Sequence, residues 1–317
     1  MNGTVGQWTG SLLQLAIALV GAPFLLSIIN RTKALIAGRV GQPWLQPYYD
    51  IWKLLHKGAV YSRTTTWVFR AGPMVGLAAV LTALLLIPAG GTAALISFSG
   101  DFLLLVYLLG LARLFMVLAA LDTGSAFEGM GASRELLFSA LAEPALLLGI
   151  ATVGRAVVRP EHAGTAILSL SHLHAAMTLD VWSRPTCFFL LIVAVALMIV
   201  LLSETCRIPV DDPTTHLELT MIHEVMVLDH GGVDFAFILY GAALKLWIFA
   251  ALLINVVLPI RTGTPLLDST ICLALMPALA VVVGLIESTM ARLKMNRVPH
   301  LLVGATALTA LAFVLEQ

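Results

Sequence analysis

Long apolar runs alternate with short polar segments along the whole chain. Eight runs come close to or exceed the roughly 20 apolar residues that an α-helix needs to cross a bilayer. They cover residues 11–29, 67–88, 102–121, 135–157, 186–203, 235–258, 269–287 and 299–315. No stretch between them is long enough for a separate soluble domain. The pattern predicts an all-α fold: a polytopic membrane bundle of about eight transmembrane helices, forming a single domain over residues 1–317.

The composition supports a membrane location. The chain is 59% hydrophobic and only 11% charged, with a mean hydropathy of +0.96, whereas soluble domains carry about 25% charged residues. The net charge of zero argues against a nucleic-acid partner. The first residues contain no basic segment and no small-residue cleavage site. We therefore expect the first apolar run to be a retained anchor rather than a signal peptide.

Lysine and arginine are distributed unevenly between alternate connections. Eleven lie in the connections that follow the first, third, fifth and seventh runs, and four lie in the others. Because basic connections stay on the cytoplasmic side, this bias predicts that the first set faces the cytoplasm. Both termini would then face outward.

The connection over residues 30–66 is too long for a simple turn and too apolar for a flexible linker. Its large apolar residues recur at helical spacing: Trp44, Leu45, Tyr48, Ile51, Trp52 and Leu55. Lys53, His56 and Lys57 fall on the other side of the same wheel. This predicts a cytoplasmic amphipathic helix, lying either at the membrane surface or beneath a partner protein.

Residues 204–234 hold seven of the chain's eighteen carboxylates, between two predicted spans. Ionised groups this close to hydrocarbon are costly unless they are paired or hydrated. If the segment is helical from His216 onward, Glu218 lies among apolar neighbours, which favours its protonated form. A carboxylate that can take up a proton suits a proton pathway. We predict a cytoplasmic acidic coupling loop, with a solvated acidic surface as the alternative.

Three ionisable residues lie well inside predicted spans, away from their ends. Arg113 and Lys245 lie about midway along the third and sixth runs, and Glu143 lies eight residues into the fourth, directly before Pro144. Such residues face the interior of a bundle and pair with one another or with water. The three indicate either a hydrated path for charge or a structural pairing of Glu143 with Arg113 or Lys245.

Other motifs point away from cofactor chemistry. Cys187, Cys206 and Cys272 are widely separated, and the eight histidines form no metal-binding pair. We therefore expect no metal site and no redox cofactor in this chain. The glycine-rich segment DTGSAFEGMGASR lacks the order of a phosphate-binding loop. We predict that it is a cytoplasmic turn that brings Asp122 and Arg134 near the acidic loop.

Three long motifs carry a family resemblance: ETCRIPVDDPTTHLELTMIHE, ALDTGSAFEGMGASRE and GRVGQPWLQPYYDIWKLLHK. They closely resemble the membrane subunits of energy-converting [NiFe] hydrogenases, the group of formate hydrogenlyase subunit 4 and hydrogenase-4 component C, which is related to subunit 1 of respiratory complex I. The complex I pattern E-x-x-R-x-P-F-D is met by Glu204, Arg207, Pro209 and Asp211, with Glu218 at the last of the acidic positions that follow. Val210 replaces the Phe, and Thr214 and His216 replace carboxylates of the quinone enzymes, which favours the hydrogenase branch.

The resemblance implies a membrane-anchoring and energy-coupling subunit. It would dock a peripheral hydrogenase arm and link electron transfer there to proton or sodium translocation. Its partners would be the hydrogenase large and small subunits, an iron–sulfur subunit and antiporter-like membrane subunits in a prokaryotic cell (inner) membrane. Those partners, rather than this chain, would hold the [NiFe] centre and the iron–sulfur clusters.

Site residues follow from the motifs and the charged spans together. The predicted pathway consists of Glu143, Glu204, Asp211, Asp212, Glu218, Glu224, Arg113, Lys245 and Asp122. The predicted structural and docking residues are Arg207, Arg39, Asp50, Lys53 and Arg134. Two alternatives remain open, a quinone-site subunit of a complex I-type enzyme and a stand-alone ion transporter.

Overall fold

Eight helices of the structure are long and apolar enough to cross a membrane, which confirms the predicted fold class. In this computed structural model all residues are described except 1, 158–168, 184–186, 212–221, 263 and 317. Within the described part, all named secondary-structure elements are helices. The chain is therefore an all-α, multi-pass membrane protein.

The long helices are α1 (Asn2–Ile36), α3 (Trp67–Leu84), α4 (Asp101–Asp122), α5 (Ala126–Val157), α8 (Cys187–Glu204), α10 (Gly232–Val257), α11 (Pro265–Thr289) and α12 (Val298–Leu315). Short helices lie in the connections: α2 (Gln46–Leu55), α6 (Leu170–Ala176), α7 (Leu179–Trp182), α9 (His223–Met226) and η3 (Met295–Arg297). Every long helix overlaps one predicted run, because hydropathy over about 20 residues is enough to identify a span.

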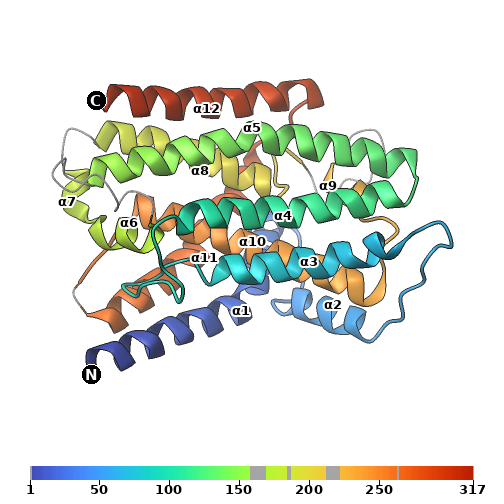
Figure 1. Ribbon diagram of the computed structural model, residues 1–317, viewed down its shortest axis with the longest axis horizontal. Helices are drawn as coiled ribbons and strands as arrows, with labels where there is room; N and C mark the ends of the chain where they lie inside the picture. The colour runs from blue at the N-terminus through green and yellow to red at the C-terminus, as the bar shows by residue number, and fades with distance from the viewer. Residues whose placement is uncertain (1, 158–168, 184–186, 212–221, 263, 317) are drawn as a thin grey trace.

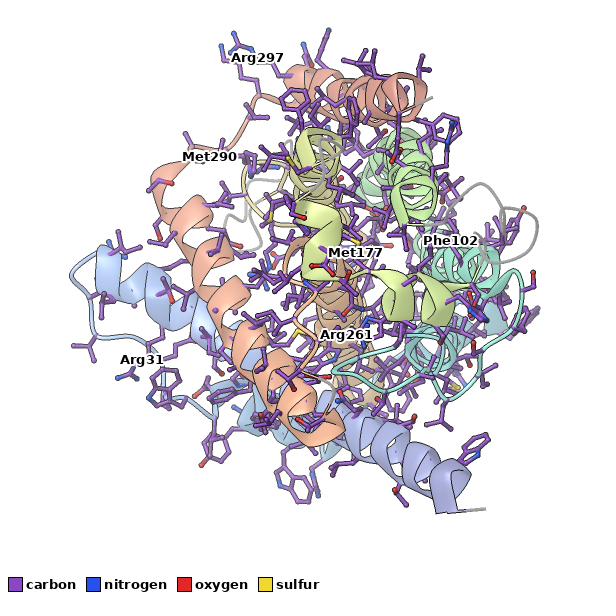
Figure 2. All side chains as sticks on the ribbon, turned by 90° about the vertical axis from the view of Figure 1, so that its left-hand side faces the viewer. Arg31, Phe102, Met177, Arg261, Met290 and Arg297 are labelled. Carbon is purple, nitrogen blue, oxygen red and sulfur yellow. The ribbon has the colours of Figure 1, made fainter. Side chains whose placement is uncertain are left out.

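Helix α10 forms the centre of the bundle. In its most apolar window 67% of the residues are buried, against 28% for α4, α11 and α12. It packs against α1, α2, α3, α8 and α11, while α12 packs on α5 and α8 at the far edge (Figure 1). Seen end-on, α11 runs obliquely down the left-hand side, from near Met290 at its upper end towards α1 (Figure 2). The core is therefore organised around α10, whose helical neighbours leave their outer faces for lipid or partners.

The two ends of the bundle carry different short elements. Both termini lie at the end that holds α6 and α7, and α2 and α9 lie at the other end (Figure 1). An even number of spans requires this arrangement. The prediction that both termini share one side is therefore confirmed as a shared end of the bundle.

The predicted glycine-rich turn over residues 122–134 is wrong in extent. Helix α5 already begins at Ala126, so the turn is confined to residues 123–125. Gly131 has a packing role inside the helix. A Cβ placed there would come within 2.2 Å of Val225 Cγ1 and 2.8 Å of the Ile222 carbonyl oxygen. The missing side chain allows α9 and the residue before it to lie directly on α5.

The amphipathic helix predicted within residues 30–66 is α2. None of its residues is buried, yet it contacts α1 and α10. Trp52 and Tyr49 are 67% and 58% exposed. Together with the exposed Trp44, beside which the Arg31 guanidinium lies 4.7 Å from the ring centroid, they form an aromatic surface at the end of the bundle opposite the termini.

Candidate functional site

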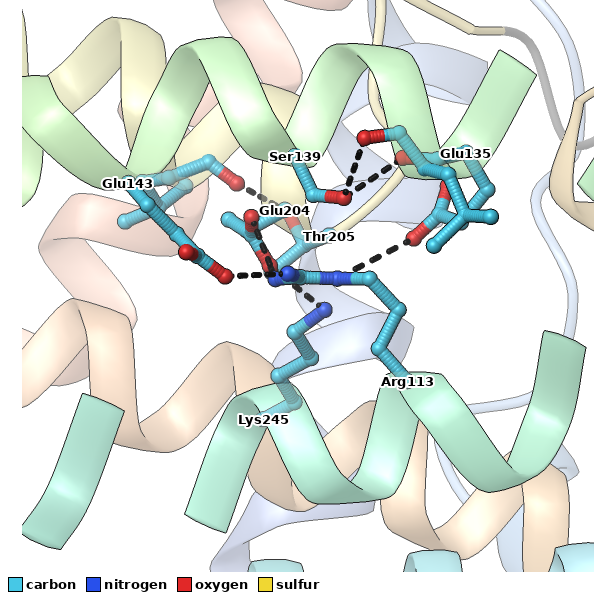
Figure 3. Close-up of polar contacts among 9 residues, drawn as sticks. Arg113, Glu135, Ser139, Glu143, Glu204, Thr205 and Lys245 are labelled. Atoms are coloured by element: carbon cyan, nitrogen blue, oxygen red, sulfur yellow. Dashed lines mark hydrogen bonds and ion pairs between the residues drawn. The ribbon is translucent and has the colours of Figure 1, made fainter. Parts of the chain in front are cut away.

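A cluster of five charged side chains joins four helices within the bundle (Figure 3). Arg113 of α4 donates from Nη1 to Glu143 of α5 at 2.6 Å. Its Nη2 donates to both carboxylate oxygens of Glu204, the last residue of α8, at 2.8 and 2.9 Å. Lys245 of α10 lies 2.8 Å from the Glu204 carboxylate, and Glu135 of α5 lies 3.9 Å from Arg113 Nε. We call these five residues the Arg113 cluster.

The Arg113 cluster is largely shielded from solvent. The exposed fractions of the side chains are 8% for Arg113, 5% for Glu204, 11% for Glu135 and 18% for Lys245. Glu143 is the exception at 38%. The cluster therefore has a buried part around Glu204 and one carboxylate that reaches the surface of the chain. Such a surface position is where a charge could pass to a neighbouring protein.

The Arg113 cluster has a net charge, and one of its hydrogen-bond donors has no partner among the described residues. Three carboxylates face two cations, so the five groups sum to −1 when all are ionised. Arg113 Nε is buried and has no hydrogen-bond partner among the described residues, although Glu135 lies 3.9 Å away. A shift of about 1 Å would turn this contact into a charge-assisted hydrogen bond. The guanidinium can thus exchange carboxylate partners with little movement.

Two further ion-pair groups lie around residues 205–211, the turn that follows α8, which we call the acidic turn. Asp211 accepts from Arg292 at 2.9 Å and from the backbone N–H of His223 at 3.3 Å, which ties this turn to α9. Glu287 of α11 is fully buried and bridges Lys33 of α1 at 2.7 Å and Arg207 at 3.2 Å. These contacts hold the acidic segment against α1, α9 and α11.

A cavity of about 100 Å³ borders the Arg113 cluster. Its walls are mainly apolar side chains of α3, α4 and α10, and its polar end is formed by Arg113, Glu135, Glu204 and Lys245. A second space of about 10 Å³ touches Glu135, Glu204 and Asp211, which is close to the smallest volume that holds a water molecule. A space of water size therefore borders both the Arg113 cluster and the turn that follows α8.

The sequence profile of the NADH dehydrogenase family matches residues 10–316. The chain belongs to this family. It is 29% identical over 309 residues to formate hydrogenlyase subunit 4 of Escherichia coli K12, covering 96% of both chains. It is also 29% identical over 310 residues to hydrogenase-4 component C of the same organism, covering 96% of this chain and 94% of the relative. The predicted resemblance is confirmed.

A solved structure shares the fold of this NADH dehydrogenase family member. A chain of the membrane-bound sulfane sulfur reductase, an archaeal respiratory membrane complex, superposes with a TM-score of 0.78 at 22% sequence identity. The match covers 98% of this chain and 100% of that one. The eight-helix arrangement is therefore shared with a chain of a membrane complex.

The structure brings together only some of the predicted pathway residues of this family member. Arg113, Glu143, Glu204 and Lys245 form one cluster. Asp212 and Glu218 lie outside the described residues. Glu224 is half-buried in α9, close to Asp211 in the chain but in a separate element.

Asp122 has a different environment from the one predicted. It accepts hydrogen bonds from the Thr66 N–H at 2.6 Å, the Thr66 hydroxyl at 2.9 Å and the Phe69 N–H at 3.3 Å. These contacts cap the N-terminus of α3. Arg134 lies in α5 and is half-buried rather than in a turn.

The predicted docking residues lie on exposed surface. Arg39, Asp50 and Lys53 are all exposed, the last two on α2. Arg207, predicted to hold the acidic segment together, is buried and paired with Glu287.

Sequence reasoning missed four charged residues that the fold brings to these sites. They are Lys33, Glu135, Glu287 and Arg292. Each lies at or beyond the edge of a predicted span, where a charge normally contacts water or lipid headgroups. In the sequence, Glu135 is the first residue of one apolar run and Glu287 is the last residue of another. Nothing else in the sequence distinguishes them.

Proposed function

We propose that this chain is the membrane-anchoring and energy-coupling subunit of a membrane-bound [NiFe] hydrogenase complex of the formate hydrogenlyase type. In this role it links electron transfer in a peripheral arm to proton or sodium translocation. The observation that carries the proposal is the Arg113 cluster, in which one buried guanidinium faces three carboxylates. The relatives, named as a subunit and a component of larger enzymes, support membership of a complex.

The cluster has the properties that charge transfer needs. Arg113 has one unpartnered donor, and Glu135 is within reach of it. Movement of the acidic turn would alter the contacts of Glu204, since that residue directly precedes the turn. The charge released at Glu204 would be compensated at Glu143, which reaches the surface of the chain. A partner's movement is thereby converted into a change of charge at the surface of the chain.

The surface that docks the partner subunits is the aromatic surface around α2. Its exposed rings and the exposed charges Arg39, Asp50 and Lys53 lie at the same end of the bundle as α9. Hydrogenase large and small subunits and an iron–sulfur subunit would bind there, carrying the [NiFe] centre and the clusters. Antiporter-like membrane subunits would lie against the bundle, in a prokaryotic cell (inner) membrane.

The test uses the whole complex reconstituted into vesicles. Glu143→Gln should reduce ion transport per hydrogen formed by about tenfold or more, because an amide cannot change its charge. Hydrogen formation from a reduced dye should stay at the wild-type rate. Asp180→Asn, which removes an exposed carboxylate of α7 at the other end of the bundle, serves as the control. Equal loss of both activities in Glu143→Gln would contradict the coupling role.

A quinone-site subunit is the second candidate. It is favoured by the cavity beside Arg113, which has apolar walls and a charged end. A quinone-like photoaffinity probe should then label residues of α3 or α10, and added quinone should prevent the labelling. If added quinone displaces no labelling, the quinone-site candidate is refuted and the hydrogenase role remains.

A further inference from the structure

Three side chains of different chemistry meet beside the Arg113 cluster. They are Glu135 of α5, Cys206 in the turn after α8, and His223 at the start of α9. One donor atom from each lies within 4.8 Å of the other two. Carboxylate, thiolate and imidazole are together a ligand set typical of zinc and related divalent ions.

The backbone holds each donor in place. Cys206 has φ +53°, and among the described residues it is the only non-glycine residue with positive φ. This conformation is unfavourable for an L-residue, and such residues cluster at functional sites. The N–H of His223 is bonded to Asp211, and α9 packs closely on α5 at Gly131. The three donors are therefore brought together by three separate segments.

The donor atoms have unused capacity. His223 Nδ1 is buried and lacks a hydrogen-bond partner within the described part of the chain. Cys206 is a free thiol. Among the described residues, the ion-pair contact of the Glu135 carboxylate is the one with Arg113 at 3.9 Å. A buried polar atom without a partner is destabilising, and a metal ion bound at His223 would supply the missing partner.

The local charge favours a divalent cation. Glu135, Glu143, Glu204 and Asp211 face Arg113, Lys245 and Arg292. Four negative and three positive groups sum to −1. Ionising the Cys206 thiol gives −2, and a divalent ion brings the total to zero.

We propose that Glu135, Cys206 and His223 form a binding site for a divalent transition-metal ion of the zinc type. Metal–ligand distances of about 2.0–2.3 Å place the tetrahedral ligand atoms of this set about 3.3–3.6 Å apart. The donor atoms, which lie within 4.8 Å of one another, must therefore close by up to about 1.5 Å. The cavity of about 100 Å³ touches all three residues, so it supplies both an access route and space for a water molecule as the fourth ligand.

Binding exchanges the metal ion for a proton. Burial, with the nearby Glu135 and Asp211, raises the pKa of the Cys206 thiol well above its usual value. The thiol proton must therefore leave as the sulfur–metal bond forms, and both electrons of that bond come from the thiolate. Because the metal displaces a proton, its affinity rises with pH.

Occupancy would also act on the Arg113 cluster. The ion would hold Glu135 away from Arg113 and would cross-link α5, α9 and the turn after α8. This consequence rests on the proposed coupling function: bound zinc then lowers ion transport more than it lowers dye-linked hydrogen formation.

The site is tested by loading the chelator-washed complex with Zn²⁺ and recording its X-ray absorption spectrum. One sulfur at about 2.3 Å and nitrogen or oxygen ligands at about 2.0–2.2 Å are expected. The sulfur should be lost in Cys206→Ser and kept in Cys272→Ser, which removes a buried thiol in α11. His223→Gln should weaken binding by at least about tenfold. A spectrum unchanged by Cys206→Ser would overturn the proposal.

A second probe keeps the proposal testable if Cys206→Ser fails to assemble. Titration of the wild-type complex with Co²⁺ alone should produce a thiolate-to-cobalt absorption, which His223→Gln should weaken and Cys187→Ser should leave unchanged. No such absorption, or one lost in Cys187→Ser, would overturn the site. Neither measurement depends on ion transport. If metal binds at Cys206 and transport is unaffected, the site is supported and only its effect on coupling is refuted.

Discussion

The contact between Lys245 and Glu204 allows charge and stability to be separated. With all groups ionised, the Arg113 cluster carries −1. Lys245→Met lowers this to −2 and leaves Arg113 as the one cation paired with Glu204 among the described residues. Glu204→Gln raises it to 0. The double variant Glu204→Gln/Lys245→Met returns it to −1, so its charge equals that of the wild type although two ionisable groups are gone.

The size of the effect follows from distance and burial. Two unit charges 2.8 Å apart attract by about 6 kcal/mol at an effective dielectric constant of about 20. Desolvation offsets part of this, and removing one partner of a buried pair typically costs about 3–5 kcal/mol. We expect Lys245→Met to cost about 3 kcal/mol and the double variant to recover about 2 kcal/mol of it.

Stability is measured in the detergent-solubilised complex. Short protease pulses at rising temperature, followed by detection of the intact subunit, report the midpoint of its unfolding. At about 2 °C per kcal/mol, Lys245→Met should lower the midpoint by about 6 °C. The double variant should recover more than half of that loss. Its ion transport should stay impaired, because two charged side chains of the Arg113 cluster are missing. A double variant no more stable than Lys245→Met would refute the electrostatic reasoning.

Three further predictions concern residues outside the Arg113 cluster. Asp122→Ala should destabilise the chain by about 1 kcal/mol, because the N-terminal cap of α3 is lost. The amide of Phe69 should then exchange hydrogen faster while ion transport is unchanged. Impaired transport with unchanged exchange would instead support a role of Asp122 in the ion pathway. Glu287→Gln should destabilise the chain by about 3–5 kcal/mol because Arg207 loses its buried partner; a protease midpoint equal to that of the wild type would contradict this. Burial lowers the pKa of His230 from 6.5 to about 4, so the unfolded chain binds the extra proton between these values and stability should fall as the pH drops from about 6.5 towards 4. His230→Phe should flatten that part of the stability profile, and an unaltered slope would show that another group is responsible.

Part of the candidate site could be read from sequence. Arg113, Glu143 and Lys245 were recognisable because an ionisable residue in the middle of an apolar run must find a partner. The pairing itself was not determined. Glu143 pairs with Arg113, whereas Lys245 pairs with Glu204 at the end of another helix. Choosing between such partners requires the rotation and neighbours of each helix, which hydropathy does not contain.

The sequence by itself determined the number of spans, their approximate limits, the amphipathic helix α2 and the family. These depend on local properties, namely the length and periodicity of apolar runs and the order of motifs. Only the tertiary structure decided that Asp122 caps α3, that Glu287 bridges Lys33 and Arg207, and that Glu135, Cys206 and His223 meet. Each of these contacts joins residues that are far apart in the chain or in different elements. Their energy depends on distances of a few ångströms that only the packing of helices around α10 sets.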